Sequence, residues 1–274
     1  MKNHPCFSEN AHHRFGRIHL PVAPACNIQC GYCTRKYDCA NESRPGITSA
    51  VLTPAEAIER VRSLVERNER LSVIGIAGPG DPLANDATLE VSRAVHREYP
   101  ELILCISTNG LLLPDRIEEL VESGVGSITV TINAVLPEVA EKIYSWIMYR
   151  GEYYSGRPAA GILLENQWAG LSMAVEAGLA VKVNTVLIPG VNDNDIPFIA
   201  WFAGRRGADI MNIMPLIPNA AFEHFKRPSR EYVNIMRKKC GKHIPQMTHC
   251  RQCRADACGE VGEDGDMELE VLFS

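Results

Sequence analysis

Three cysteines occupy one short stretch of the chain, as Cys26, Cys30 and Cys33 in PACNIQCGYC. Three thiolates spaced C-x3-C-x2-C can converge on one small inorganic body. A structural zinc ion or a closed four-iron cubane takes four protein ligands. Three thiolates on a four-iron cubane leave one iron open, and an open iron can chelate a small molecule and pass one electron to it. The stretch therefore predicts an open iron–sulfur site, with a three-ligand zinc loop as the alternative.

Composition narrows the class of protein. The chain has 274 residues, 22% of them charged, with a formal net charge of −5, which argues against a nucleic-acid-binding surface. No apolar run approaches the roughly 18 residues that span a membrane, and the N-terminus lacks an apolar signal segment. We therefore expect a cytoplasmic protein with neither nucleic-acid nor membrane partners. Disulfides are rare in that compartment, and clustered thiols there usually bind metal.

Eight of the ten cysteines fall within residues 6–39 and 250–258. Outside the first motif, Cys6 lies in HPC near the N-terminus, and Cys39 follows the motif with Glu42 close behind. The tail string HCRQCRADAC has the spacing C-x2-C-x4-C, which suits a cubane or a zinc site on a flap that folds around metal. Its cysteines are Cys250, Cys253 and Cys258.

Strand-like and helix-like segments alternate between these cysteine regions. The predicted strands are 15–23, 71–78, 101–108, 126–133, 179–188 and 208–217, and the predicted helices are 53–67, 86–98, 114–123, 159–177, 195–205 and 229–239. Such alternation indicates an α/β fold with a parallel sheet and right-handed crossovers. Six units are too few for a closed eight-fold barrel, so we predict a partial (β/α)6 barrel, with a flat doubly wound sheet as the alternative.

The same pattern predicts three parts of the chain. They are an irregular N-terminal extension (1–14), the barrel (15–240) and a cysteine-rich flap and tail (241–274). The closing LEVLF resembles part of a protease-site tag.

Polar residues gather where the predicted strands end. AGPGDP (77–82) follows the second strand, and Ser107, Asn109, Thr131 and Asn133 lie at the C-terminal ends of the next two, whereas Asn184 lies nearer mid-strand. In β/α barrels the C-terminal rim carries the site. These residues are therefore candidates to line one.

The cysteine spacing, with Tyr32 before the last cysteine, resembles the signature of radical S-adenosylmethionine (SAM) enzymes. In that family the open iron binds the amino and carboxylate groups of SAM, and one electron then releases a 5′-deoxyadenosyl radical. AGPGDP resembles the family's glycine-rich segment, although Asp81 stands where many members have Glu. The resemblance implies a radical SAM type of partial barrel whose cofactor contacts come from Ala77, Gly78, Gly80, Asp81, Ser107, Asn109, Thr131, Asn133 and Asn184.

A narrower resemblance, to the family of radical enzymes of nitrogenase cofactor biosynthesis in a short form without a carrier domain, rests on longer strings. They are HPC, HLPVAPACNIQCGYC, YDCANESRPG, AGPGDPLAN, STNGL and LIPGVND. The resemblance implies an enzyme that fuses two 4Fe-4S clusters, with a carbide from SAM and an added ninth sulfur, into an eight-iron precursor. It implies iron–sulfur cluster donor and acceptor scaffold proteins as partners, and an electron donor such as ferredoxin.

For the paired clusters we predict the ligands Cys6, His13, Cys250, Cys253 and Cys258, with Cys39 and Glu42 as catalytic helpers or proton donors. His12 or His19 could replace His13, and Cys105 could face either the barrel interior or the helix layer. The alternative function is a radical SAM enzyme that acts on a peptide or organic substrate and uses auxiliary clusters for electron transfer. A protein that only carries clusters is the rival from another class.

Overall fold

The protein is built on one seven-stranded sheet. The computed structural model describes residues 4–7, 11, 14–41, 46, 48–250 and 255–260. The strand order is β10-β1-β3-β4-β5-β8-β9, and the six strands after β10 pair in parallel and in chain order. These six are β1 (Gly16–His19), β3 (Leu71–Ile76), β4 (Ile103–Thr108), β5 (Val125–Thr131), β8 (Ala180–Leu187) and β9 (Ile210–Pro215).

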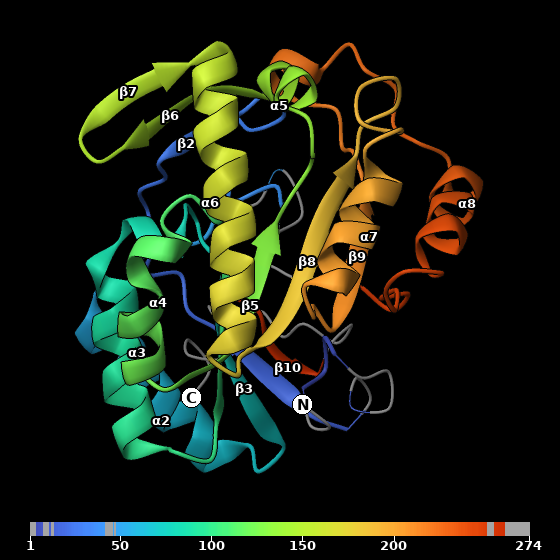
Figure 1. The fold of residues 1–274 in the computed structure, drawn as a ribbon. Helices are drawn as coiled ribbons and strands as arrows, with labels where there is room; N and C mark the ends of the chain where they lie inside the picture. The colour runs from blue at the N-terminus through green and yellow to red at the C-terminus, as the bar shows by residue number, and fades with distance from the viewer. Residues whose placement is uncertain are drawn as a thin grey trace.

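Helices follow the strands and cover one face of the sheet (Figure 1). They are α2 (Pro54–Arg67), α3 (Asp86–Glu98), α4 (Leu113–Glu122), α6 (Gly156–Glu176), α7 (Ile196–Arg205) and α8 (Arg230–Cys240). A doubly wound sheet reverses its strand order at a switch point, whereas the described parallel strands keep chain order throughout. The predicted partial barrel is therefore confirmed, and the flat alternative is wrong.

Helix α2 shows why the local predictions succeed. The Thr53 hydroxyl accepts a hydrogen bond from the Glu56 backbone N–H (3.3 Å), and the Glu56 carboxylate accepts one from the Thr53 N–H (2.8 Å). Pro54 occupies the first turn, where a missing N–H costs nothing. This capping box satisfies two of the N–H groups that every helix start leaves open.

Residues 134–158 hold elements that the sequence analysis missed. Helix α5 (Pro137–Ile143) leads into β6 (Tyr144–Tyr149) and β7 (Glu152–Ser155), which form a small antiparallel sheet with β2 (Ile28–Cys30). Strand β2 lies inside the cysteine loop, the name used here for residues 24–35. The pairing of β2 with β6, and the hydrogen bond from the Gly31 N–H to the Ile143 carbonyl at the end of α5 (2.7 Å), fix the cysteine loop from outside the barrel.

The tail also contributes to the barrel. Strand β10 (Cys258–Glu260) pairs antiparallel with β1 and extends that edge of the main sheet. The predicted tail, 241–274, is therefore partly continuous with the sheet. The domain boundaries themselves stay predictions. Among the helices that the structure describes, none combines the length and the apolar character needed to cross a membrane.

Candidate functional site

One pocket, here called the first pocket, lies at the C-terminal ends of the parallel strands. It has about 660 Å³ of space, part of it open to solvent. The cysteine loop, the segment after β3 and the ends of β4 and β5 contribute to it. Its lining includes Cys26, Cys30, Cys33, Cys39, Gly80, Asp81, Ser107, Asn109 and Thr131.

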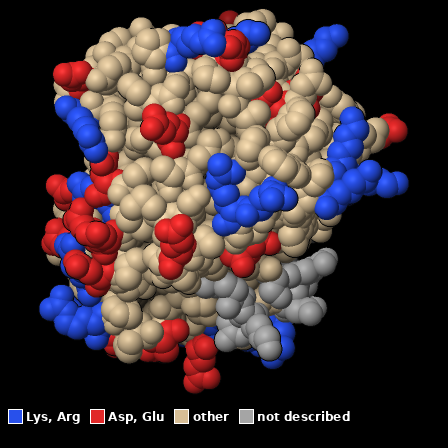
Figure 2. Space-filling model, in the orientation of Figure 1, with Lys and Arg blue, Asp and Glu red and all other residues tan. Residues whose placement is uncertain are grey.

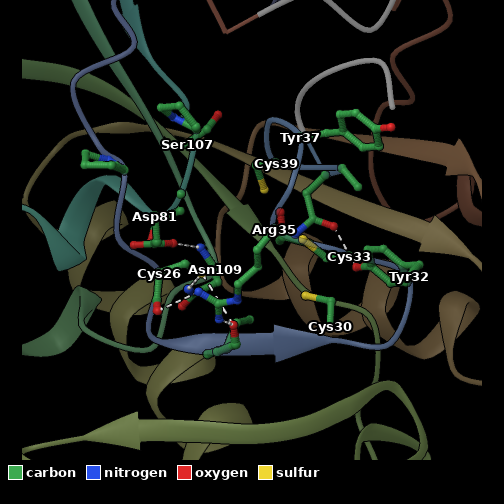
Figure 3. A pocket seen from close by; sticks show the side chains of 18 residues that line it. Cys26, Cys30, Tyr32, Cys33, Arg35, Tyr37, Cys39, Asp81, Ser107 and Asn109 are labelled. Atoms are coloured by element: carbon green, nitrogen blue, oxygen red, sulfur yellow. Dashed lines mark hydrogen bonds between the residues drawn. The ribbon is translucent and has the colours of Figure 1, made fainter. Parts of the chain in front are cut away.

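The three cysteines of the predicted cluster site share this lining. Figure 3 shows the sulfurs of Cys30, Cys33 and Cys39 around the cavity, with the Arg35 side chain running between Cys26 and Cys30. Burial raises the pKa of Cys26 to about 11 and raises the pKa of Cys30 well above its usual value. Without metal both groups are therefore neutral thiols, and iron binding would release their protons.

Two side chains that sequence reasoning missed hold the cysteine loop in shape. Gln29 donates from its amide nitrogen to the carbonyls of Cys33 (2.6 Å) and Cys30 (3.0 Å). Arg35 donates to the carbonyl of Cys26 (3.0 Å) and to the Gln29 side-chain oxygen (2.8 Å). Its guanidinium also lies 4.9 Å from the centre of the Trp146 ring on β6, a cation–π distance. The loop is thus organised before any metal binds.

The glycine-rich segment packs directly against the start of the cysteine loop. A Cβ at Gly80 would lie 2.2 Å from the Ala25 carbonyl oxygen, so only glycine fits there. The Asp81 N–H donates to that carbonyl (2.9 Å). Gly80 therefore serves the contact between two protein segments as well as lining the pocket.

Asp81 is engaged within the protein. Its carboxylate accepts hydrogen bonds from the Thr108 hydroxyl (2.9 Å) and the Asn109 N–H (2.6 Å). Burial raises its pKa to about 6, against the opposing effect of these hydrogen bonds. The carboxylate braces the end of β4, and the Asn109 side chain in turn donates to Asn27 of the cysteine loop (2.7 Å).

The donor set fits the cofactors that the sequence predicts. Three thiols of the lining could hold a cluster, and Ser107, Asn109 and Thr131 supply polar groups beside them. The Thr131 hydroxyl is buried and has no hydrogen-bond partner among the residues that the structure describes, which suits a group that meets a bound ligand.

Four predicted cofactor contacts lie elsewhere. Asn133 is fully buried outside the lining, where it donates to the hydroxyls of Tyr32 (2.8 Å) and Tyr144 (3.0 Å). Gly78 is also absent from the lining, whereas Ala77 and Asn184 line a different pocket. Gly78 and Asn133 each lie two residues beyond the ends of β3 and β5, where the alternation of a strand no longer sets the direction of a side chain.

That different pocket, here called the second pocket, is the barrel interior. It encloses about 680 Å³ and shares Asn41 and Ser107 with the first pocket, so the two adjoin. Residues two apart on successive strands line it, as expected for one face of a sheet. Its lining includes His4, Cys6, Arg17, His19, Ala77, Cys105, Lys182, Asn184, Asn212, Met214 and Cys250.

Ligand-type side chains from four separate parts of the chain meet in the second pocket. Cys6, Cys105 and Cys250 bring three thiols, and His4 and His19 bring two imidazoles. A Cβ at Gly75 would lie 2.7 Å from the His19 ring, so this glycine makes room for the imidazole. Cys105 thus faces the interior, which the sequence left open.

The second pocket also holds buried charge. Arg17 is 1% exposed and Lys182 is 6% exposed, and both line it. Burial raises the pKa of the Cys6 thiol, while Lys182 and Arg17 act in the opposite direction. Burial, then Lys182, lowers the pKa of His4 to about 3, and within the described part of the chain its Nε2 has no hydrogen-bond partner. His4, Arg17 and Lys182 were missed by sequence reasoning, although the i, i+2 pairs Arg17/His19 and Lys182/Asn184 on predicted strands were a signal.

The remaining ligand predictions have different outcomes. Cys258 pairs with Ile18 and packs in the main core outside both linings, and its role as a cluster ligand stays a prediction. Cys240 is buried in that core. His12, His13, Glu42 and Cys253 lie outside the described residues. Among the described residues, no three His, Cys, Asp or Glu side chains are arranged for a single metal ion.

Comparisons with known proteins identify the class. A family model described as the radical SAM superfamily matches residues 20–202. A radical SAM methyltransferase from Sphaerobacter thermophilus has a TM-score of 0.55 and 24% identity, covering 85% of this chain and 64% of its own. Streptococcus suis SuiB has a TM-score of 0.61 and 13% identity, covering 85% and 49%. The chain belongs to the radical SAM superfamily.

More similar relatives share one name. "FeMo cofactor biosynthesis protein NifB" of Klebsiella pneumoniae is 49% identical over 98% of this chain and 59% of its own length. The protein of the same name from Azotobacter vinelandii is 47% identical over 99% of this chain and 55% of its own length. The chain thus resembles NifB along nearly its whole length, while it spans a little over half of these relatives.

Proposed function

We propose that this protein is a radical SAM enzyme of nitrogenase cofactor biosynthesis, which fuses two 4Fe-4S clusters into an eight-iron, nine-sulfur precursor with a central carbide. The observation that carries the proposal is the pair of adjoining pockets, one with a three-cysteine motif and the other with three further thiols and two imidazoles. The name FeMo cofactor biosynthesis protein, borne by relatives 47–49% identical, supports the same reading.

In the first pocket Cys26, Cys30 and Cys33 would hold the resident cluster, and Ser107, Asn109 and Thr131 would contact SAM. When bound, these two cofactors supply a 5′-deoxyadenosyl radical and a transferable methyl group. The protein's own part is to position them. Gln29 and Arg35 fix the cysteine loop, and Asp81 fixes the end of β4 through Thr108 and Asn109.

In the second pocket the two substrate clusters would be shared among Cys6, Cys105, Cys250 and His19. The predicted ligands His13 and Cys253 remain part of this proposal. A substrate cluster must leave when it is finished, and a mixed set of thiolate and imidazole ligands releases it more readily than four thiolates, because imidazole can be protonated.

The buried cations have a role in this reading. Thiolate-ligated iron–sulfur clusters carry net negative charge. Lys182 and Arg17 would offset that charge in a pocket that water reaches poorly, where charge interactions are strong. Cys39, which lines the first pocket, and Glu42 remain proposed as helpers or proton donors close to the substrate.

Anaerobic reconstitution with SAM carrying a labelled methyl group tests the function. We expect about twelve iron atoms per chain before reaction, from three cubanes, release of 5′-deoxyadenosine on reduction, and labelled carbon in the extracted cluster. Iron near four per chain in well-reconstituted protein would rule out the fusion. Full iron loading and deoxyadenosine without labelled carbon in the cluster would instead favour a radical enzyme with auxiliary electron-transfer clusters.

A further inference from the structure

Charge is distributed unequally between the two ends of the helix layer. Residues 54–122, which include α2, α3 and α4, contain thirteen Asp and Glu but seven Lys and Arg. Residues 196–242, which include α7 and α8, contain three Asp and Glu but nine Lys and Arg. Figure 2 shows acidic side chains gathered on the side of α3 and α4, and basic ones toward α7 and α8. A protein of net charge −5 thus presents one distinctly basic side.

The segment between β9 and α8 connects this basic side to the cysteine loop. Phe222 is buried against the loop, where a Cβ at Gly31 would lie 2.4 Å from its ring. The rings of Phe222 and Tyr32 are 6.0 Å apart between centres, and those of Phe222 and Phe225 are 4.7 Å apart. Phe225 is half-buried, so this line of rings runs from the predicted cluster ligands towards the surface.

Basic residues flank Phe225 in the sequence. Lys226 and Arg227 are exposed and follow it directly, and Arg230 begins α8 three residues after Arg227. Glu223 and Glu231 are the acidic residues of the same stretch. A half-buried ring with exposed Lys and Arg next to it in the chain is suited to a partner whose surface is acidic around an apolar centre.

We propose that the surface formed by Phe225, Lys226, Arg227 and Arg230 is the docking site of an acidic one-electron redox protein. This docking site rests on the proposed function, because a radical SAM enzyme needs one electron for each SAM that it cleaves. The donor loses one electron and the resident cluster gains one, so no other reactant is required. Electron transfer weakens steeply with distance, and this segment is in direct contact with the cysteine loop.

The test compares two reductants on the anaerobic, reconstituted enzyme. Dithionite is small and needs no docking surface, whereas a purified acidic plant-type ferredoxin, with a potential of about −400 mV, must dock. The variant Lys226→Glu/Arg227→Glu reverses two charges at the proposed site. Lys238→Glu/Lys239→Glu is the matched control, since these exposed residues lie about 12 Å along α8 from Arg230.

We expect Lys226→Glu/Arg227→Glu to lower ferredoxin-driven release of 5′-deoxyadenosine roughly tenfold or more at low salt. Dithionite-driven release should stay unchanged. With ferredoxin, the control variant should lose less than half as much 5′-deoxyadenosine release as Lys226→Glu/Arg227→Glu. High salt should shrink the difference, because it screens exposed charges. An unchanged ferredoxin rate, an equal loss in the control variant, or an equal loss with dithionite would each overturn the docking site. Absence of dithionite-driven release from the wild type would instead overturn the radical function itself.

Discussion

The first and second pockets adjoin, yet the chain builds them in opposite ways. The three thiols of the first pocket lie within residues 26–33, on one loop held by nearby side chains. The three thiols of the second pocket are Cys6, Cys105 and Cys250, which meet only because the strands curl into a partial barrel. If the proposed function holds, the resident cofactor relies on a local loop, whereas the substrate that is assembled and released is enclosed by the fold itself.

The two pockets also differ in where their positive charge lies. Positive charge at the first pocket comes from Arg35, which is turned to the loop's own carbonyls, while the second pocket has the buried cations Arg17 and Lys182 on its wall. The difference between the pockets predicts that they can be disabled separately.

The largest effect should come from Cys30→Ala. Removing one of three thiolates leaves the resident cluster without a stable hold, so 5′-deoxyadenosine release should fall to background. Cys240→Ala is the control, since that thiol is buried in the core away from both pockets. Deoxyadenosine production retained by Cys30→Ala would break the assignment of the first pocket.

Cys105→Ala should affect the second pocket alone. We expect iron to fall from about twelve atoms per chain to about eight or fewer, while SAM cleavage with dithionite persists. Iron analysis and deoxyadenosine assay on the same sample check both. If Cys105→Ala abolishes SAM cleavage while the metal-free protein stays folded, the two pockets do not act independently.

Lys182→Met should weaken the binding of substrate clusters by roughly tenfold, or about 1.4 kcal/mol. The substitution removes a buried positive charge, while the Met side chain is similar in length to that of Lys. The measurement is the iron retained during a chelator challenge. Lys182→Arg keeps the positive charge, so this variant should retain most of the iron. Equal loss from both variants would mean that packing, not charge, matters at this position.

Gly80→Ala should destabilise the protein by about 1–3 kcal/mol, since its Cβ would overlap the Ala25 carbonyl and displace the cysteine loop. Thermal unfolding of the metal-free protein measures this. Gly161→Ala is the control, because it lies within α6 and its Cβ would meet no atom within 4 Å. That variant should be neutral or more stable by about 0.5–1 kcal/mol.

The smallest effect should be that of Thr53→Ala, which removes the N-cap of α2. A loss of about 1 kcal/mol is expected, visible in chemical denaturation. Iron content should not change, because α2 contributes to neither lining. A loss of iron in this variant would show that cluster binding responds to general stability and would weaken the separation of the two pockets.

The sequence by itself determined the parts of this protein that depend on neighbours along the chain. Helix α2 follows from its capping box, the six parallel strands follow from apolar runs, and the first pocket's thiols follow from one loop. Residues 134–158 were missed because β6 pairs with β2, more than a hundred residues earlier, and β7 joins this sheet only through β6.

The tertiary structure alone decided which side chains share the second pocket. Cys105 could face either side of β4 as far as its own neighbours are concerned, and only the pairing of β10 with β1 places Cys258 against the main core. The physical reason is that a strand residue's face depends on register with partners far away in the sequence, and one residue of register reverses it.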